Sequence, residues 1–533
     1  MSMDRVLDAA STASAGLGGF PGLRYGELVE RRALRQPQRT AIIHDGEHIT
    51  YEQLLTRIRA AAAFLATRGV GAGDRVVCFA ENRPEVLIAL YACSRIGAVF
   101  TPLGISSRAG EVQHVLEDLS AHTLLVSTRS MPTALEAVGT ADLPLIQLED
   151  DAEAAHPCLP QHSHDPAPEV VPHPEAPALI VYTSGTSGRP KGVVLTHGAL
   201  FFNGVNVVLG LDVVSEDVTL VNTPLSHIAA LNTLAVATLH KGGIVVLDSK
   251  FDAGRCLEQI TRYGVSTMFA VPSMLTLLSQ HPGFAEAEIS SLRWILGGGA
   301  PMPPDLVAQW STRGVPVLAS YGMTEAGPSI SFRRRTDAAG KPGSSGPPAL
   351  LTDVRILSTD GEELPVGQTG EIRVRGPHTA SAYWANEAAT EATFQDGWLV
   401  TGDRGYLDAD GDLCITGRSK EIIITGGENV DPAEVEHLIS RYPGVLEAAV
   451  VGRPDPLWGE TVTAVVVSTA PVDLQDLREF LRPHLAGFKL PRQLERRDHL
   501  PRSAVGKLLR KEIQNLPPDQ EPVSPVRTPK EKP

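Results

Sequence analysis

One stretch of the chain combines glycines, hydroxyls and a lysine as a phosphate-binding loop does. It reads Val181-Tyr-Thr-Ser-Gly-Thr-Ser-Gly-Arg-Pro-Lys-Gly192 and follows residues 178–182, whose composition predicts a strand. Small residues let backbone N–H groups wrap an anion, and Lys191 adds a point charge. The loop is not a Walker A motif, because Gly192 follows the lysine where Ser or Thr would stand. The length and order of the stretch favour a nucleotide phosphate site over an ordinary Ser/Gly turn.

Four further motifs follow in order along the chain: Ser320-Tyr-Gly-Met-Thr-Glu-Ala-Gly327, Trp398-Leu-Val-Thr-Gly-Asp403, Gly417-Arg-Ser-Lys-Glu-Ile-Ile-Ile-Thr-Gly-Gly-Glu-Asn-Val430 and Pro501-Arg-Ser-Ala-Val-Gly-Lys-Leu-Leu-Arg510. Together with the phosphate loop they resemble the motifs of the adenylate-forming (AMP-binding) superfamily. That superfamily includes acyl-CoA synthetases, peptide-synthetase adenylation domains and beetle luciferases. The resemblance covers about residues 25–513 and is greatest to fatty-acyl and aryl-CoA ligases.

The resemblance implies that a carboxylic acid is activated by ATP as acyl-AMP, with release of pyrophosphate. Acid and α-phosphate are both negative, so such a site must neutralise charge and align the reacting groups. The implied catalytic residues are Lys507, Thr324, Glu325 and Lys191, with Glu325 as the Mg²⁺ ligand. The implied ATP- and AMP-binding residues are Thr183, Ser184, Gly185, Thr186, Ser187, Gly188, Gly298, Gly299, Ala300, Pro301, Tyr321, Gly322, Met323, Asp403 and Arg418.

These residue types suit their implied roles. Tyr321 would lie against adenine, and a carboxylate at Asp403 can accept from both ribose hydroxyls. Lys507 would bridge the acid and the α-phosphate as a mobile point charge. A relative that binds nucleotide only as a sensor would have lost Lys191, Glu325, Asp403 or Lys507, and the chain keeps all four.

The second step is transfer of the acyl group to a thiol. By resemblance, Gly426, Gly427 and Glu428 line a tunnel for a phosphopantetheine arm after the C-terminal domain rotates about a hinge at Lys420. Both coenzyme A and a carrier protein present such an arm. The chain is therefore predicted to be an AMP-forming acyl-CoA synthetase, an acid–thiol ligase. The alternative is transfer to a carrier-protein phosphopantetheine or to another nucleophile in a specialised biosynthetic pathway.

The acid itself is predicted to lack an α-amine. Amino-acid activators usually carry an Asp in the stretch Asn222-Thr-Pro-Leu-Ser-His-Ile-Ala-Ala-Leu-Asn232, and here no acid is present. His227 stands where fatty-acyl and aryl-CoA ligases have a gating residue, although a lone histidine could also be a packing residue. We expect His227, Ile228, Ala230 and Gly297 to line an apolar pocket, for a chain or a ring.

Composition excludes other classes of protein. The 533 residues carry 47 Lys and Arg against 62 Asp and Glu, a formal charge of −15, which argues against nucleic-acid binding. The five cysteines are scattered without a C-x-x-C pair, as in a reducing cytoplasm, where we expect the protein to act on a small acid. Residues 86–105 are apolar but contain Arg95 and Pro102, so they predict a buried helix and strand rather than a membrane span.

The elements alternate in the order that builds parallel sheet. Helices at 51–66, 84–95 and 111–119 alternate with strands at 75–80, 98–103 and 122–127, which predicts βαβ units. The predicted fold is α/β, with a large N-terminal domain of βαβ-layered subdomains plus a β-rich subdomain and a small mobile α+β C-terminal domain. We expect residues 1–417 to form the first domain, with an exposed linker at about 150–177. Residues 418–513 are expected to form the second domain, and residues 514–533 a disordered tail.

Overall fold

A computed structural model describes residues 24–149, 156–163, 168–183, 190–337, 341, 343–418, 421, 423–426, 428–502 and 508–517. By its internal contacts the chain divides into two units. The larger unit is Met1–Val354 with Arg373–Val400, and the smaller unit is Arg355–Ile372 with Thr401–Pro533. The predicted boundary at residue 418 differs from this division and stays a prediction.

The first sheet of the larger unit has the strand order β17-β8-β7-β4-β3-β5-β6. Its strands are β3 (Arg75–Phe79), β4 (Val99–Leu103), β5 (Thr123–Val126), β6 (Leu145–Gln147), β7 (Pro177–Thr183), β8 (Lys191–Thr196) and β17 (Ala382–Tyr383). β3 shows why the sheet is buried on both faces, since Val76 and Cys78 enter one core and Val77 and Phe79 enter another. The second of these cores is closed by α5 (Ala109–Leu119) and α6 (Met131–Val138).

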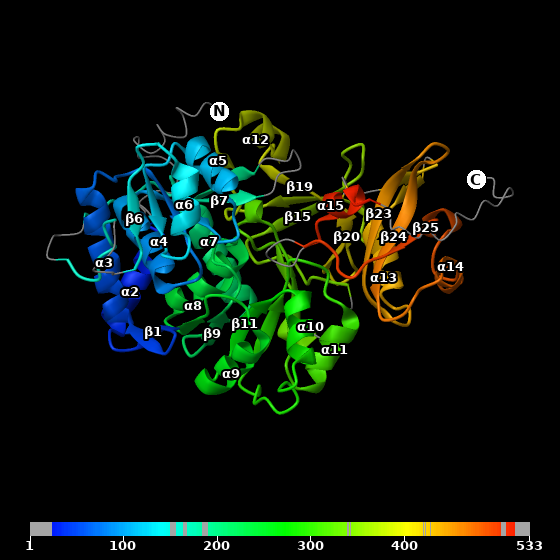
Figure 1. The fold of residues 1–533 in the computed structure, drawn as a ribbon, viewed down its shortest axis with the longest axis horizontal. Helices are drawn as coiled ribbons and strands as arrows, with labels where there is room; N and C mark the ends of the chain where they lie inside the picture. The colour runs from blue at the N-terminus through cyan, green and yellow to red at the C-terminus, as the bar shows by residue number, and fades with distance from the viewer. Residues whose placement is uncertain are drawn as a thin grey trace. The chain divides into compact units, whose positions relative to one another are not determined.

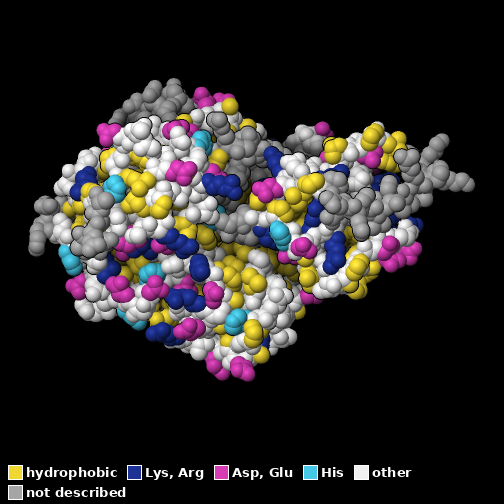
Figure 2. Space-filling model, viewed as in Figure 1, with side chains coloured by type: hydrophobic (Ala, Val, Ile, Leu, Met, Phe, Trp, Pro, Cys, Tyr) yellow, Lys and Arg dark blue, Asp and Glu magenta, His cyan; other side chains and the backbone are white. Residues whose placement is uncertain are grey.

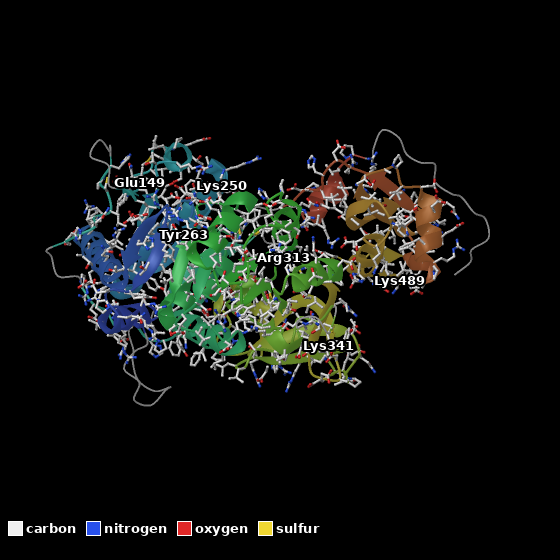
Figure 3. All side chains as sticks on the ribbon, turned by 90° about the horizontal axis from the view of Figure 1, so that it is seen from below. Glu149, Lys250, Tyr263, Arg313, Lys341 and Lys489 are labelled. Atoms are coloured by element: carbon white, nitrogen blue, oxygen red, sulfur yellow. The ribbon has the colours of Figure 1, made fainter. Side chains whose placement is uncertain are left out.

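The second sheet of the larger unit has the order β14-β13-β12-β11-β9-β10-β1-β2. Its strands are β1 (Thr40–His44), β2 (Glu47–Thr50), β9 (Val218–Val221), β10 (Ile244–Leu247), β11 (Thr267–Ala270), β12 (Trp294–Gly297), β13 (Val317–Tyr321) and β14 (Ser331–Phe332). The strands from β13 to β1 are parallel, and β14 and β2 pair antiparallel at the two edges. One face is covered by α9 (Ala253–Tyr263), α10 (Pro272–Gln280) and α11 (Pro304–Thr312). Arg313, just after α11, places its guanidinium 4.9 Å from the centroid of the Phe284 ring (Figure 3).

A layer of helices lies between the two sheets, so the larger unit alternates helix, sheet, helix, sheet and helix (Figure 1). These helices are α2 (Glu27–Arg35), α3 (Tyr51–Thr67), α4 (Pro84–Ile96), α7 (His197–Gly210) and α8 (Val236–Lys241), the last preceded by the π-helical turn η1 (Ala229–Ala235). Thr50 and Gln53 form a capping box at the start of α3. α4 begins with Pro84 and ends at Ile96, and the residue that follows it, Gly97, has a φ of 74°, which suits glycine.

Shorter elements complete the larger unit and lead into the smaller one. They are the 3₁₀ turns η2 (Thr324–Ala326) and η3 (Arg335–Asp337), α12 (Glu387–Thr393) and β18 (Phe394–Gln395). A sheet with the order β15-β16-β19-β18, with β20 paired to β19, contains residues of both units. Its other strands are β15 (Asp353–Leu357), β16 (Gly370–Arg375), β19 (Trp398–Leu407) and β20 (Leu413–Arg418).

The rest of the smaller unit is an α+β sandwich. Its sheet has the order β22-β21-β24-β23, and β25 pairs parallel with β24. The strands are β21 (Ile423–Thr425), β22 (Glu428–Val430), β23 (Val445–Asp455), β24 (Gly459–Ser468) and β25 (Gln493–Arg496). α13 (Pro432–Ile439) and α14 (Leu474–Leu481) cover one face, α15 (Arg510–Asn515) packs on the other, and a 3₁₀ turn, η4 (Gly487–Lys489), follows α14.

The predicted α/β fold class is confirmed, whereas the bounds of the linker and of the tail stay predictions. In the described part of the stretch 150–177, Leu159 is buried in the central core, and Glu169 pairs with Arg24 and Arg95. At the start of the predicted tail, the Gln514 amide donates to the Gly452 carbonyl at 2.8 Å within the packing of α15. Polar composition does not reveal such individual anchoring contacts.

Charged side chains and apolar helices of the described residues bear on two of the composition arguments. On the face of the larger unit shown in Figure 2, basic side chains are interspersed with acidic ones. Among the described helices, none has the length and apolarity needed to cross a bilayer. The apolar stretch 86–105 forms α4 and β4, as predicted.

Candidate active site

The predicted site residues of the larger unit gather where parallel strands end. β9, β11, β12 and β13 run parallel, so the segments that follow them meet at one edge of the sheet. His227 follows β9, Gly298 follows β12, and Tyr321 ends β13 just before Glu325. Such carboxyl edges are where ligands bind to open α/β sheets. Residues from distant motifs are thereby brought to a common edge.

Glycines let the loops at this edge approach one another closely. A Cβ on Gly322 would lie 1.6 Å from the carbonyl oxygen of Pro328, so this position excludes any side chain. A Cβ on Gly298 would lie 2.9 Å from Ser320 Oγ and 3.0 Å from Phe269 Cε2. Ser320 in turn donates to the Gly297 carbonyl at 2.9 Å, which holds the loop after β12 against β13. The segments that follow β12 and β13 are therefore packed closely at this edge.

Glu325 is a nearly buried carboxylate held by hydrogen bonds. It lies on the turn η2, and its side chain accepts a hydrogen bond from Tyr383 Oη at 2.6 Å. Its backbone carbonyl accepts from the Ala380 N–H at 2.8 Å. Among the described residues, no Lys or Arg forms an ion pair with Glu325. A buried carboxylate without a basic partner fits a hard divalent cation, and Mg²⁺ commonly takes one or two carboxylates together with phosphate oxygens.

Lys191 begins β8, directly after the predicted phosphate loop. β7 and β8 pair antiparallel with Thr183 opposite Lys191, so the loop connects the two strands of a hairpin. The Lys191 ammonium lies 5.4 Å from the centroid of the Tyr383 ring. Within the described parts of the chain, no carboxylate pairs with Lys191. Such a cation fits an anionic ligand better than a structural ion pair.

Asp403 and Arg418 are neighbours in the smaller unit. They face each other across β19 and β20, and Arg418 Nε lies 2.9 Å from Asp403 Oδ1. Asp403 is buried, and its backbone N–H donates to Thr401 Oγ1 at 3.1 Å. Arg418 is partly exposed. The two residues are therefore neighbours in the structure, whereas their binding of ribose stays a prediction.

The candidate acid-binding residues surround the start of a π-helical turn. His227 precedes η1, and Ile228 and Ala230 are buried beside it. Burial lowers the pKa of His227 to about 4, so its imidazole is neutral at physiological pH. π-helical turns inside helices are frequent at functional sites. His227 is thus a buried, neutral imidazole beside two buried apolar side chains, and an acid-binding pocket there stays a prediction.

The predicted thiol region forms a tight hairpin in the smaller unit. Gly426 has a φ of 60°, and its N–H donates to the Trp458 carbonyl at 2.8 Å. A Cβ on Gly426 would lie 2.8 Å from Trp458 Cε3, and the Arg492 guanidinium lies 4.2 Å from the centroid of a Trp458 ring. Gly426, the Trp458 indole and the Arg492 guanidinium thus lie close together. In the same unit, the Lys489 ammonium, labelled in Figure 3, donates to Glu434 at 2.6 Å.

Several predicted site residues lie outside the described residues: Ser184, Gly185, Thr186, Ser187, Gly188, Lys420, Gly427 and Lys507. Sequence reasoning missed Tyr383, because one tyrosine after a Ser-Ala pair carries no chemical pattern. It also missed Asn82, whose partners lie more than a hundred residues away. Trp458 stood within the stretch Arg453-Pro-Asp-Pro-Leu-Trp-Gly-Glu460, where its aromatic ring was a usable signal.

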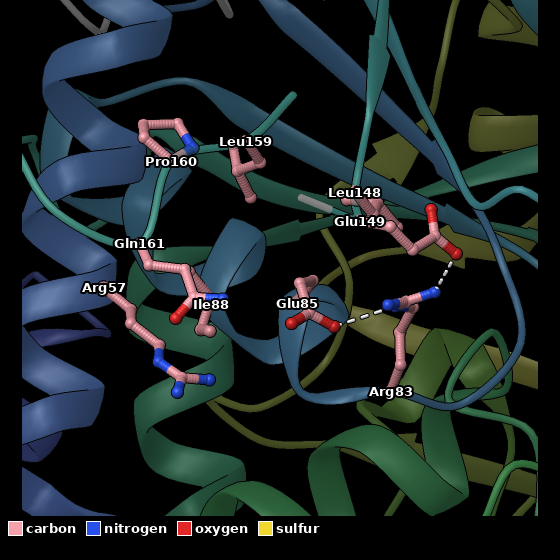
Figure 4. A pocket seen from close by; sticks show the side chains of 9 residues that line it. All are labelled: Arg57, Arg83, Glu85, Ile88, Leu148, Glu149, Leu159, Pro160 and Gln161. Atoms are coloured by element: carbon pink, nitrogen blue, oxygen red, sulfur yellow. Dashed lines mark hydrogen bonds and ion pairs between the residues drawn. The ribbon is translucent and has the colours of Figure 1, made fainter. Parts of the chain in front are cut away.

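A small pocket elsewhere in the larger unit contains none of the predicted site residues (Figure 4). It is lined by Arg57, Arg83, Glu85, Ile88, Leu148, Glu149, Leu159, Pro160 and Gln161. Arg83 is paired with both Glu85 and Glu149, and Arg57 with Glu47. Because these guanidinium groups are neutralised, the pocket does not resemble a phosphate site.

Comparison with known proteins agrees with this geometry. The profile of the AMP-binding enzyme family matches residues 29–384, and that of the AMP-binding enzyme C-terminal domain matches residues 434–507. The feruloyl-CoA synthase of Amycolatopsis sp is 41% identical over 502 residues, which are 93% of this chain and 98% of that protein. The indoleacetate–CoA ligase of Aromatoleum aromaticum is 36% identical over 93% of this chain and 98% of its own.

A solved structure shows the same architecture. The o-succinylbenzoate CoA synthetase of Bacillus subtilis, in complex with its acyl-adenylate intermediate, superposes with a TM-score of 0.81. It is 33% identical, and the match covers 92% of this chain and 98% of that one.

The fold and the site thus define an enzyme that activates a carboxylic acid with a nucleotide. The chain belongs to the AMP-binding enzyme family. It is an AMP-forming acid–thiol ligase, which uses ATP and Mg²⁺ to convert a small carboxylic acid to acyl-AMP and transfers the acyl group to coenzyme A.

Proposed function

We propose that the acid is an aromatic carboxylate without an α-amine. The observation that carries the proposal is the group of segments that meet at the carboxyl edge of the second sheet. There the neutral His227 and the buried Ile228 and Ala230 follow β9, and Gly297 ends β12. These residues would offer an apolar lining that suits an aromatic ring, and an ammonium group would find no carboxylate in the stretch 222–232. The names of the feruloyl and indoleacetate relatives support the same class of acid.

The residues of the larger unit would bind the phosphates of ATP and the acid. The glycine-rich loop and Lys191 would hold the phosphates, with Thr324 beside them, while Tyr321 and the segment after Gly298 would enclose adenine. Glu325 would hold Mg²⁺, which when bound neutralises phosphate charge and so favours attack by the acid.

The residues of the smaller unit would bind ribose and would serve adenylation first and thiol transfer second. Asp403 would accept hydrogen bonds from the ribose hydroxyls, with Arg418 beside it. Lys507 would contact both the acid and the α-phosphate during adenylation. Gly426, Gly427 and Glu428 would line the path of the coenzyme A thiol, with Lys420 as the hinge. The mobile domain that carries Arg418, the thiol path and Lys507 is proposed to be residues 418–513, with Asp403 just before it.

Two further aspects belong to this proposal. Transfer to a carrier-protein phosphopantetheine would use the same tunnel, since the arm is shared, and is the second candidate acceptor. We also propose that the enzyme works in the cytoplasm, where ATP and coenzyme A are available and where its five scattered cysteines would stay reduced.

A comparison of acids tests the substrate class. Pyrophosphate release and acyl-CoA formation are measured with a cinnamate-type acid, with a straight-chain acid of equal carbon number, and with phenylalanine. We expect kcat/KM for the aromatic acid to exceed that for the straight-chain acid by at least about tenfold, and phenylalanine to be inert. Preference for the straight chain would refute the aromatic proposal, and turnover of phenylalanine would refute the assignment of an acid without an amine.

Two variants of the smaller unit test whether adenylation and thiol transfer depend on different residues. Lys507→Ala should reduce acid-dependent pyrophosphate release by ~10²–10³-fold while leaving supplied acyl-adenylate usable by coenzyme A. Gly427→Leu should do the opposite, because a bulky side chain would obstruct the thiol path. Circular dichroism verifies that both fold. Parental adenylation in Lys507→Ala, or parental thioester formation in Gly427→Leu, would overturn the corresponding assignment, and transfer only to a phosphopantetheinylated carrier would favour the second acceptor.

A further inference from the structure

One short strand contacts two of the charged groups at the candidate site. β17 contains Tyr383, whose hydroxyl donates to Glu325 Oε1 at 2.6 Å. Three residues earlier, the Ala380 N–H donates to the carbonyl of Glu325 at 2.8 Å. The same segment therefore holds both the backbone and the side chain of Glu325. Nothing else in the described structure donates to that carboxylate from a side chain.

The same tyrosine also faces Lys191. β17 pairs antiparallel with β8, so Tyr383 lies opposite Val193, and the Trp384 N–H donates to the Gly192 carbonyl at 2.7 Å. This register brings the Tyr383 ring centroid to 5.4 Å from Lys191 Nζ, within the range of a cation–π contact. One face of a single ring is thereby directed at the lysine while its hydroxyl reaches the carboxylate.

The backbone of Tyr383 is itself fixed. Its N–H donates to Thr390 Oγ1 at 3.0 Å, and its ring packs 6.1 Å from that of Phe394. A fixed donor on Oε1 sets the rotation of the Glu325 carboxylate and directs its remaining lone pairs elsewhere.

We propose that Tyr383 is a positioning residue, which orients Glu325 toward a divalent cation and Lys191 toward the phosphates of the nucleotide. This inference rests on the proposed role of Glu325 as the magnesium ligand. Its hydroxyl acts on the carboxylate and its ring acts on the lysine. The two actions are separable, because Tyr383→Phe removes only the hydroxyl and Tyr383→Leu removes the aromatic face as well.

Metal binding is measured without turnover, by the Mn²⁺ electron paramagnetic resonance signal of the enzyme with a non-hydrolysable ATP analogue. We expect Tyr383→Phe to weaken Mn²⁺ binding roughly tenfold, since the lost hydrogen bond is to a charged group. Binding of the analogue in EDTA should be unchanged in Tyr383→Phe and roughly two- to fivefold weaker in Tyr383→Leu. Transfer from supplied acyl-adenylate to coenzyme A should stay at the parental rate in both.

Tyr51→Phe is the matched control. Tyr51 is another buried tyrosine of the larger unit, and its hydroxyl donates to the carbonyls of Leu239 and Gly243, away from Glu325. The Tyr51→Phe substitution should lower the free energy of unfolding without changing Mn²⁺ affinity. If Tyr383→Phe is recovered only unfolded, Thr390→Val, which loosens the Tyr383 backbone, is measured in the same way and should shift Mn²⁺ affinity in the same direction.

Glu325→Gln separates failure of the inference from failure of the proposed function. If Glu325→Gln binds Mn²⁺ as the parent does, Glu325 is not the metal ligand and the proposed function is wrong at that residue. If Glu325→Gln loses Mn²⁺ while Tyr383→Phe keeps parental affinity, the positioning role of the hydroxyl is refuted. Unchanged analogue binding in Tyr383→Leu would refute the role of the ring toward Lys191.

Discussion

Asn82 holds the loop that carries the candidate acid-binding residues. Its Nδ2 donates to the carbonyls of Thr223 at 2.8 Å and Asp248 at 3.1 Å, and its Oδ1 accepts from the Leu225 N–H at 2.7 Å. Asn82 follows β3 of the first sheet, whereas its partners follow β9 and β10 of the second. Asn82 is buried, with 3% of its surface exposed, and its hydrogen bonds connect the two sheets. Its partner Leu225 lies two residues before His227.

Replacement by leucine keeps the number of side-chain heavy atoms but removes all three hydrogen bonds and adds bulk to a buried site. Each bond contributes about 1 kcal/mol net, and a buried polar group left without a partner costs about 1–3 kcal/mol. We therefore expect Asn82→Leu to lower the free energy of unfolding of the larger unit by about 3–5 kcal/mol. Urea denaturation followed by the fluorescence of the buried Trp294 and Trp310 measures this loss.

The same change should affect the acid more than ATP. A loop released from Asn82 no longer holds His227 and Ile228 in place, so KM for the acid should rise about tenfold while KM for ATP stays within about twofold. Thr50→Ala is the control, since it removes the cap of α3 and should cost about 1 kcal/mol without changing either KM. Stability within about 0.5 kcal/mol of the parent, together with an unchanged KM for the acid, would refute this reasoning.

Three other predictions follow from burial and close packing. Burial lowers the pKa of His197 to about 3 and of His378 to about 4, so the unfolded chain binds more protons between pH 4 and about 6.5. The free energy of unfolding should therefore fall with decreasing pH in that window by about 1.4 kcal/mol per pH unit for each histidine, and His378→Gln should flatten the slope in urea titrations. Burial raises the pKa of Asp431, the N-cap of α13, to about 6, so its carboxylate destabilises the smaller unit increasingly as pH rises from about 4 to 6. Asp431→Asn keeps a good cap and should be about 1–2 kcal/mol more stable than the parent at pH 8 but not at pH 4, and equal stability at both would contradict this. Gly298→Ala would force Ser320 or Phe269 to move and should cost about 1–3 kcal/mol, with a raised KM for ATP, whereas an unchanged KM for ATP would remove Gly298 from the nucleotide site.

Local patterns in the sequence were sufficient for the individual elements. The helix predicted at 51–66 is α3, which begins at Tyr51 as expected, where Thr50 and Gln53 form a capping box. The helices predicted at 84–95 and 111–119 are α4 and α5, whose bounds differ by two residues at most, since helix periodicity is encoded within one turn or two. The glycine-rich loop and the motifs around Glu325 and Asp403 were also visible, because close approach to an anion or a sugar requires particular residue types at short spacing.

Tertiary structure decided which of these motifs lie together. The sequence by itself determined the α/β alternation and, through its ordered motifs, the chemistry of carboxylic acid activation. It also showed that the stretch 222–232 has no Asp or Glu that could pair with an α-ammonium group of a substrate. It did not determine that β17, near residue 383, would pair with β8, near residue 193, and bring Tyr383 between Lys191 and Glu325. Nor did spacing indicate that Asn82 would join two sheets, or that Leu159 would be buried within a polar stretch. Strand pairing and buried hydrogen bonds between distant residues depend on the whole packed core, and no local period or composition encodes them.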